Sequence, residues 1–173
     1  MYSHVQPFIV ENHLNDYAKS YLVYRDILFN LLDSPIKSTQ HIGGTKHFNY
    51  PTEPILDILV GVDNLHDITS LDEKRLNYAG FYRIHQPMHK KVLMAKFNNL
   101  SELKQTVRLH IIQRNTTVFQ QYIETDQILS HHPTAIAHFN TFKQQIHPSM
   151  PIRDYESLKQ SYFKKLSHII HTN

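Results

Sequence analysis

The chain has 173 residues, with 18 Lys and Arg against 15 Asp and Glu, and a formal charge of +3. Its 40% hydrophobic content argues against a disordered chain. The complete lack of Cys excludes disulfides, a thiolate nucleophile and a Cys-based zinc site. No apolar run approaches the ~18 residues that a membrane span needs, and the N-terminus does not follow the pattern of a signal peptide. We therefore expect a single cytoplasmic domain over residues 1–173, with no membrane partner.

The first part of the chain alternates between helical and strand patterns. The apolar spacing of Leu14–Leu32 predicts an amphipathic helix that ends before Pro35, because a residue preceding proline avoids the helical region. A short strand is expected over Ile36–Ile42. Pro54–Val62 is the clearest strand, and its continuous apolar character predicts burial on both faces of a sheet. Asp63 or Asn64 is a candidate cap for a short helix that reaches about Leu71.

The remaining elements are three strands followed by three helices. The strands are expected over Gly80–Ile84, Val92–Phe97 and Val107–Ile112, and the helices over Thr116–Leu129, from His132-Pro133 onward, and over Ile152–Ile170. A helix, a strand-rich middle and a helical end argue for an α+β or mixed α/β fold. Lys and Arg are scattered and form no tract of five or more, which favours a solvated surface over a nucleic-acid partner.

A pair of glycines and a carboxylate lie close together in this sequence. Gly43-Gly44 follows the strand expected to end at Ile42, and such a turn frees backbone N–H groups for a phosphate. Asp57 interrupts the apolar run of the next strand, where burial of a carboxylate calls for a cation or a metal ion. A small-residue turn followed by strand carboxylates is the layout of Mg²⁺-dependent nucleotidyl transfer, in which the acidic groups hold the metal ions.

Three stretches in a fixed order carry a resemblance to a known family. They are His41-Ile42-Gly43-Gly44-Thr45 with Glu53-Pro54-Ile55-Leu56-Asp57-Ile58, then Arg108-Leu109-His110-Ile111-Ile112, and in the tail His132-Pro133 with Tyr155, Lys159 and Phe163. From about Tyr17 to Ile170 the chain resembles the GrpB family, which is similar to the nucleotidyltransferase superfamily that includes DNA polymerase β. The resemblance implies a nucleotidyltransferase-like mixed β-sheet flanked by helices, with a helical C-terminal third.

The sequence departs from the family pattern at positions that matter for chemistry. The family's Ser after the first glycine is Gly44 here, its Lys before the strand proline is Glu53, and the first His of its His-Leu-His strand is Arg108. The run before His-Pro, Thr125–Leu129, lacks the family's Arg. In active nucleotidyltransferases a second carboxylate follows the first by two residues, and Leu59 occupies that position. The acidic motif is therefore incomplete.

Strand periodicity predicts which side chains meet. Alternate residues of a strand share a face, so Asp57 lies on one face with Leu59, while Arg108 and His110 share a face of a later strand from which they could reach Asp57. Two-metal catalysis needs carboxylates that bridge ions ~3.5–4 Å apart. A single Asp57 carboxylate suits one Mg²⁺ that is also held by substrate phosphates.

Each candidate residue has a functional and a structural interpretation. Asp57 is either a catalytic Mg²⁺ ligand or the partner of Arg108 in a structural ion pair. His110 is either a catalytic base or ligand, or a core histidine hydrogen-bonded to Asp57. Arg108 is either that ion-pair partner or a phosphate clamp, for which its bidentate geometry is suited. His41, Gly43, Gly44 and Thr45 form either a phosphate-binding turn, in which the Thr45 hydroxyl replaces the family's Ser, or a tight turn alone.

The expected function is Mg²⁺-dependent transfer of a nucleotidyl group from a nucleoside triphosphate to a small acceptor, at a partly degenerate site. Two alternatives stay open on the same fold. One is a module that binds a nucleotide or another anion without chemistry, and the other is a regulatory interaction protein.

Overall fold

A five-stranded mixed sheet forms the centre of the computed structural model, which describes residues 16–47, 53–67, 70–84, 90–146 and 150–171. The strand order is β1-β2-β5-β4-β3. Strands β2 and β5 run parallel, and the other neighbouring pairs are antiparallel. The strands are β1 Ile36–Ile42, β2 Leu56–Val62, β3 Tyr82–Arg83, β4 Lys91–Phe97 and β5 Gln105–Gln113. The predicted mixed sheet is confirmed, and β2 is an interior strand as its apolar run indicates.

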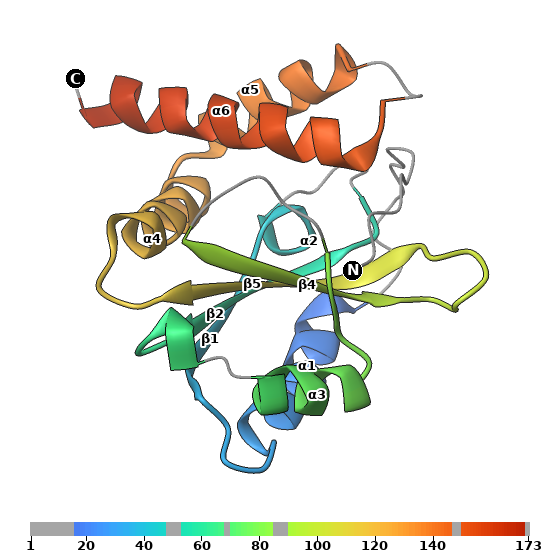
Figure 1. Cartoon of the computed structure of the whole chain (residues 1–173). Coiled ribbons are helices and arrows are strands. Elements are labelled where there is room, and N and C mark those ends of the chain that lie inside the picture. The colour runs from blue at the N-terminus through green and yellow to red at the C-terminus, as the bar shows by residue number, and fades with distance from the viewer. Residues whose placement is uncertain (1–15, 48–52, 68–69, 85–89, 147–149, 172–173) are drawn as a thin grey trace.

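Helices cover both faces of this sheet (Figure 1). Helices α1 (Tyr17–Phe29) and α3 (Ser70–Tyr78) lie on one face. On the other face lie α4 (Thr117–His131), α5 (Pro133–Gln144) and α6 (Ile152–His171), which confirms the helical C-terminal third. Within the described ranges, none of the helices is both long enough and apolar enough to cross a membrane.

Local capping explains where the helices begin. The Asp16 carboxylate accepts a hydrogen bond from the Lys19 N–H at 3.0 Å at the start of α1, and the Thr116 hydroxyl accepts one from the Phe119 N–H at 3.3 Å at the start of α4. Proline at the first position of α5 has no N–H to leave unsatisfied there. Helix α1 ends at Phe29, three residues before the predicted end, and its predicted start at Leu14 lies outside the described residues.

The helix predicted between Asp63 and Leu71 is wrong in extent. The Asn64 side chain does cap a turn, accepting from the His66 N–H at 3.0 Å, but only a 3₁₀ turn over Leu65–Asp67 follows. Helix α3 then begins at Ser70, and the sequence pattern does not predict it. Its sequence is mostly polar and places Leu76 alone among its described residues in the fully buried core, so its apolar periodicity is weak.

The core is divided by the alternation of strand residues. All seven residues of β2 are buried. One face of the sheet packs a large apolar cluster against α1 and α3, to which β2 and β5 contribute Leu56, Ile58, Val60, Val62, Val107, Leu109 and Ile111. The other face carries a smaller cluster of Ile42, Leu59 and Ile112 that packs on α4. Asp57, Arg108 and His110 belong to this second face.

Candidate functional site

The predicted grouping of Asp57, Arg108 and His110 exists and is buried. Asp57 of β2 is the ladder partner of Arg108 of β5, and the three side chains belong to residues that are 1–5% exposed. The Asp57 Oδ1 atom lies 2.9 Å from His110 Nε2 and 3.6 Å from Arg108 Nη1. Arg108 Nε also donates to Gln105 Oε1 at 3.0 Å, which fixes the plane of the guanidinium. A buried carboxylate is thus held by one cation and one histidine.

Gly43 places the end of β1 directly against this carboxylate. Its φ of +81° lies in the left-handed region, and a Cβ at this position would come within 3.0 Å of Asp57 Oδ2. Glycine is therefore required here both for backbone conformation and for space. Gly44, also buried, begins the single helical turn α2 (Gly44–His47), whose Lys46 and His47 N–H groups both donate to the Gly43 carbonyl at 3.2 Å.

His41 and Thr45, although they belong to the same motif, do not join the Asp57 group. His41 pairs with Ile58 in the ladder, so its side chain lies on the α1 face and stacks on Tyr21 with ring centroids 5.6 Å apart. The Thr45 hydroxyl lies 2.9 Å from His41 Nε2. Burial, with a contribution from the Lys46 charge, lowers the pKa of His41 to about 4. His41 is therefore neutral at pH 7, and its contact with Thr45 supports the glycine turn from the α1 face of the sheet.

The charge states of the group follow from its surroundings. Burial raises the pKa of the Asp57 carboxyl, but the Arg108 guanidinium, the hydrogen bond from His110 and the Lys159 ammonium bring that pKa below its ordinary value. Burial lowers the pKa of His110 to about 4, and Lys91 and Arg108 act in the same direction while Asp57 opposes them. At neutral pH Asp57 is ionised and His110 is neutral, with its Nε2–H donating to the carboxylate.

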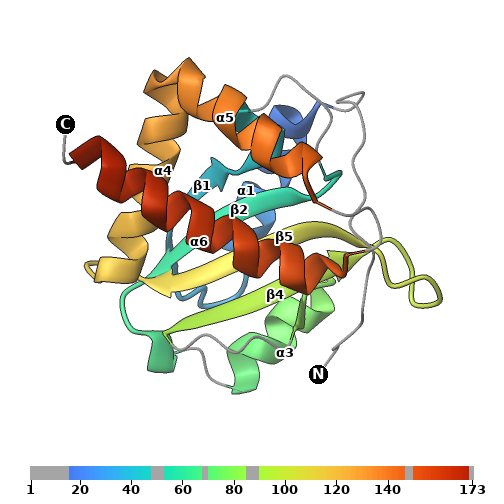
Figure 2. The same cartoon turned by 90° about the horizontal axis from the view of Figure 1, so that it is seen from above.

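Lys159 of α6 is a residue that the sequence interpretation did not place in the site. Helix α6 crosses above β2 and β5 (Figure 2), and its fully buried Tyr155 packs with Leu129 and Phe139. Lys159 follows one turn later, with Nζ 5.8 Å from the centroid of the Tyr155 ring, and its charge acts on Asp57. The family's Tyr-x-x-x-Lys spacing was the available signal, because residues four apart share a helix face.

A second buried carboxylate, Asp126 of α4, lies on the same side of the sheet. It accepts from Gln40 Nε2 at 2.6 Å, from Lys46 Nζ at 2.8 Å and from His47 Nε2 at 2.6 Å. Burial raises the pKa of Asp126, but the hydrogen bonds from His47 and Lys46 bring it below its ordinary value. Asp126 therefore ties α2, and with it the Gly43 turn, to α4 and β1.

No second carboxylate completes the acidic motif at Leu59, which packs in the apolar cluster with Ile42 and Ile112. Asp63 is exposed and pairs with Arg114 beyond the far end of β2. Glu53 is buried and precedes β2. Within the described part of the chain, no group of three or more His, Asp or Glu side chains is arranged to hold a metal ion.

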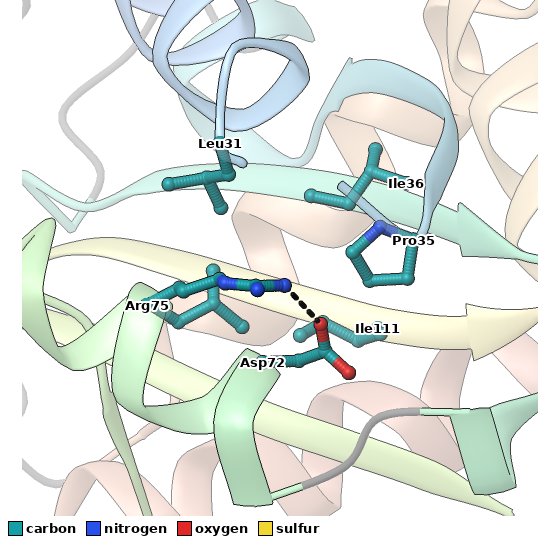
Figure 3. Close-up of a pocket in the computed structure, with 7 residues that line it drawn as sticks. Leu31, Pro35, Ile36, Asp72, Arg75 and Ile111 are labelled. Carbon is teal, nitrogen blue, oxygen red and sulfur yellow. Dashed lines mark hydrogen bonds and ion pairs between the residues drawn. The ribbon is translucent and has the colours of Figure 1, made fainter. Parts of the chain in front are cut away.

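A small pocket lies on the opposite face of the sheet, between the loop that follows α1, the start of β1, α3 and β5 (Figure 3). It contains an ion pair between Asp72 and Arg75 at 3.4 Å. The rest of its lining is apolar and consists of Leu31, Pro35, Ile36, Leu76 and Ile111. This pocket shares no residue with the Asp57 group. It therefore serves as a control region when ligand binding at the Asp57 group is tested.

Comparison with known proteins identifies the family. The family model described as GrpB protein matches residues 7–168 of the chain. The chain belongs to the GrpB family. Its GrpB relatives include the Glutamate-rich protein GrpB of Alkalihalophilus pseudofirmus, which is 25% identical over 144 residues that make up 83% of each protein.

Solved structures agree with the fold. The conserved protein GrpB from Enterococcus faecalis superposes with a TM-score of 0.75 and 23% identity, over 91% of this chain and 93% of that one. The Cid1 poly(U) polymerase bound to Mg 3′-dATP gives a TM-score of 0.50 and 13% identity, over 74% of this chain and 39% of that one. At these identities the likeness concerns the fold, and it confirms the predicted nucleotidyltransferase-like architecture of this GrpB chain.

Proposed function

We propose that this GrpB-family chain binds a nucleoside triphosphate, or another small phosphorylated anion, where the Gly43 turn meets Asp57, Arg108 and Lys159. The carrying observation is that Gly43 lies against Asp57 Oδ2 while cations from two separate elements act on the same carboxylate. With His110 neutral, Asp57, Arg108 and Lys159 together bring one negative and two positive charges. Positive charge beside a glycine turn favours phosphate groups, to which Arg presents a planar fork of donors.

A single Mg²⁺ fits the residues present, whereas a pair of bridged ions does not. Asp57 offers one carboxylate, and the neighbouring position on the same strand face is the apolar Leu59. Mg²⁺ is commonly held by one or two protein carboxylates together with substrate phosphates. Asp57 would hold such an ion, which would neutralise phosphate charge in the bound nucleotide.

Nucleotidyl transfer to a small acceptor is the second candidate, favoured by the contact of the glycine turn with a strand carboxylate. In that reaction Asp57 would hold the metal ion. The acceptor hydroxyl oxygen bonds to the α-phosphorus as the bond from that phosphorus to its bridging oxygen breaks, the hydroxyl proton passes to water and pyrophosphate leaves. His110 is poorly suited to be the base, because its pKa of about 4 makes it a weak proton acceptor and its Nε2 already donates to Asp57.

Calorimetric titration with ATP, GTP, CTP and UTP, each with and without Mg²⁺, tests the binding proposal. We expect Lys159→Gln to weaken nucleotide binding by at least about tenfold, since hydrogen bonds to charged groups contribute about 1.5–3 kcal/mol. The matched control is Lys164→Gln, which removes an exposed charge from the same helix. Equal affinity of Lys159→Gln and Lys164→Gln, or no binding of any nucleotide by the parent protein, would contradict the proposal.

Release of pyrophosphate separates the two candidates. If the chain transfers nucleotidyl groups, incubation with a nucleoside triphosphate, Mg²⁺ and a mixture of small hydroxyl compounds releases pyrophosphate, and Asp57→Asn abolishes the release. Binding without pyrophosphate release would leave the first candidate and remove the second.

A further inference from the structure

A line of hydrogen bonds runs from Asp57 through His110 and Tyr122 to Lys91 of β4. Beyond His110, whose Nε2 faces Asp57, the Tyr122 hydroxyl lies 3.3 Å from His110 Nδ1. Lys91 Nζ then donates to the Tyr122 hydroxyl at 2.5 Å. Lys91 is only 8% exposed. The elements β2, β5, α4 and β4 thus contribute one side chain each to a continuous chain of hydrogen bonds between the sheet and α4.

One direction of donation satisfies every group along this line. The Lys91 ammonium can donate hydrogen bonds but cannot accept them, so the Tyr122 oxygen accepts from Lys91. The Tyr122 hydroxyl proton is then available to His110 Nδ1. A His110 ring that accepts at Nδ1 carries its proton on Nε2, and Nε2–H then donates to the ionised Asp57 at 2.9 Å. The hydrogen bond between Lys91 and Tyr122 therefore favours, together with Asp57, the Nε2–H tautomer of His110.

We infer that Lys91 and Tyr122 are positioning residues for the proposed anion site: they hold His110 as an Nε2–H donor to Asp57 Oδ1. The contact fixes the rotation of the carboxylate and keeps Oδ2 toward the Gly43 turn. The ring geometry agrees, with the His110 and Tyr122 centroids 5.4 Å apart and Lys91 Nζ 5.2 Å from the Tyr122 centroid.

Asp57 opposes the competing tautomer at the other ring nitrogen. With its proton on Nδ1, His110 would direct the Nε2 lone pair at the Asp57 carboxylate, which is also an acceptor. A buried acceptor pair of this kind loses its hydrogen bond and leaves polar groups unsatisfied. The charged and titratable groups shown to act on His110 are Asp57 of β2, Arg108 of β5, Tyr122 of α4 and Lys91 of β4, so the tautomer depends on groups from each of these elements.

Long-range ¹H–¹⁵N correlation spectra of the histidine rings, recorded at pH 7, test the inference directly. We expect the parent protein to show His110 protonated at Nε2, with the signal assigned by its loss in His110→Gln. Tyr122→Phe should shift the His110 nitrogens toward a mixture of tautomers. The matched control is Tyr21→Phe, which removes one hydroxyl, bonded to Thr39 at 2.9 Å, from the opposite face and should leave the His110 signals unchanged.

Lys91→Gln provides a second variant if Tyr122→Phe does not fold. Without the Lys91 ammonium, the Tyr122 hydroxyl loses its donor, so Lys91→Gln should also shift the His110 nitrogens toward a mixture of tautomers. A parent His110 protonated at Nδ1, or parental His110 nitrogen shifts in both Tyr122→Phe and Lys91→Gln, would overturn the inference.

Only the affinity part of this inference rests on the proposed function. We expect Tyr122→Phe to weaken ATP binding about fivefold in the presence of Mg²⁺, with Tyr21→Phe equal to the parent. A tautomer shift with parental ATP affinity would overturn the positioning role at the anion site. A tautomer shift in a protein that binds no nucleotide at all would instead support the hydrogen-bonded line and count against the proposed function.

Discussion

The two faces of the sheet use adjacent residues of one strand for different purposes. Ile58 of β2 packs into the large apolar cluster under α1 and α3, whereas its neighbour Asp57 contacts Arg108 and His110 on the face covered by α4, α5 and α6. Apolar burial is non-directional and needs no particular partner. Each polar group on the other face needs a specific partner at a specific distance. Stability should therefore depend on both faces, but anion binding on one.

The largest effect is expected from Arg108→Met, which leaves Asp57 buried without its guanidinium. Removing one partner of a buried ion pair destabilises a protein by about 3–5 kcal/mol, because the remaining charge is uncompensated. The pKa of Asp57 should rise as well. Urea unfolding at pH 7 measures the loss, and a destabilisation below about 1 kcal/mol would show that Arg108 is dispensable for the folded state.

Ile58→Ala tests the apolar face. Ile58 is fully buried, and truncating such a side chain to Ala costs about 2–5 kcal/mol through lost burial and the cavity that remains. The same urea titrations report this value. Nucleotide affinity of the folded variant should match that of the parent, and a large loss of affinity would mean that the two faces are coupled.

The depressed pKa of His110 predicts a specific dependence of stability on pH. With a pKa of about 4 in the folded state against an ordinary value of 6.5, the unfolded chain binds the proton first as the pH falls. The contribution of neutral His110 to the free energy of unfolding is fully present above pH 6.5. It decreases by up to about 3 kcal/mol as the pH falls toward 4. His110→Gln should lose less stability between pH 7 and pH 4.5 than the parent. Parallel profiles would contradict the depressed pKa.

Asp126→Asn should have a smaller effect, of about 1–3 kcal/mol, because the amide cannot accept all the bonds from Gln40, Lys46 and His47. The control is Asp63→Asn, which removes an exposed ion pair with Arg114 and should change stability by less than about 1 kcal/mol. Unfolding curves for the two variants at pH 7 give the comparison. Equal effects would mean that burial adds nothing to the Asp126 contacts.

Much of this arrangement could be predicted from the sequence, because alternation along strands is strict. The grouping of Asp57 with Arg108 and His110 follows from the parity of residues on two strands. The same alternation places His41 and Asp57 on opposite faces of the sheet. Assigning His41 to the site because it belongs to the glycine motif did not take this alternation into account. Helix α3 cannot be predicted in the same way, because its mostly polar sequence has only a weak apolar periodicity.

The parts of the site that were missed depend on packing between distant elements. The Lys159 charge acts on Asp57 only because α6 crosses the sheet above β2 and β5. Lys91 and Tyr122 meet because β4 and α4 lie on either side of His110. The Tyr-x-x-x-Lys spacing places Lys159 on the Tyr155 face of its helix, but no local pattern encodes the crossing of α6 or the meeting of Lys91 with Tyr122.

Mapping of backbone amide shifts during titration with ATP and Mg²⁺ tests most directly the claim that one face of the sheet binds the anion. We expect the largest changes at Gly43, Gly44 and His110, with Ile58 and the opposite pocket unaffected. Changes concentrated instead at Leu31, Asp72 and Arg75, which line the pocket on the opposite face, or the absence of any change at saturating ATP, would contradict it.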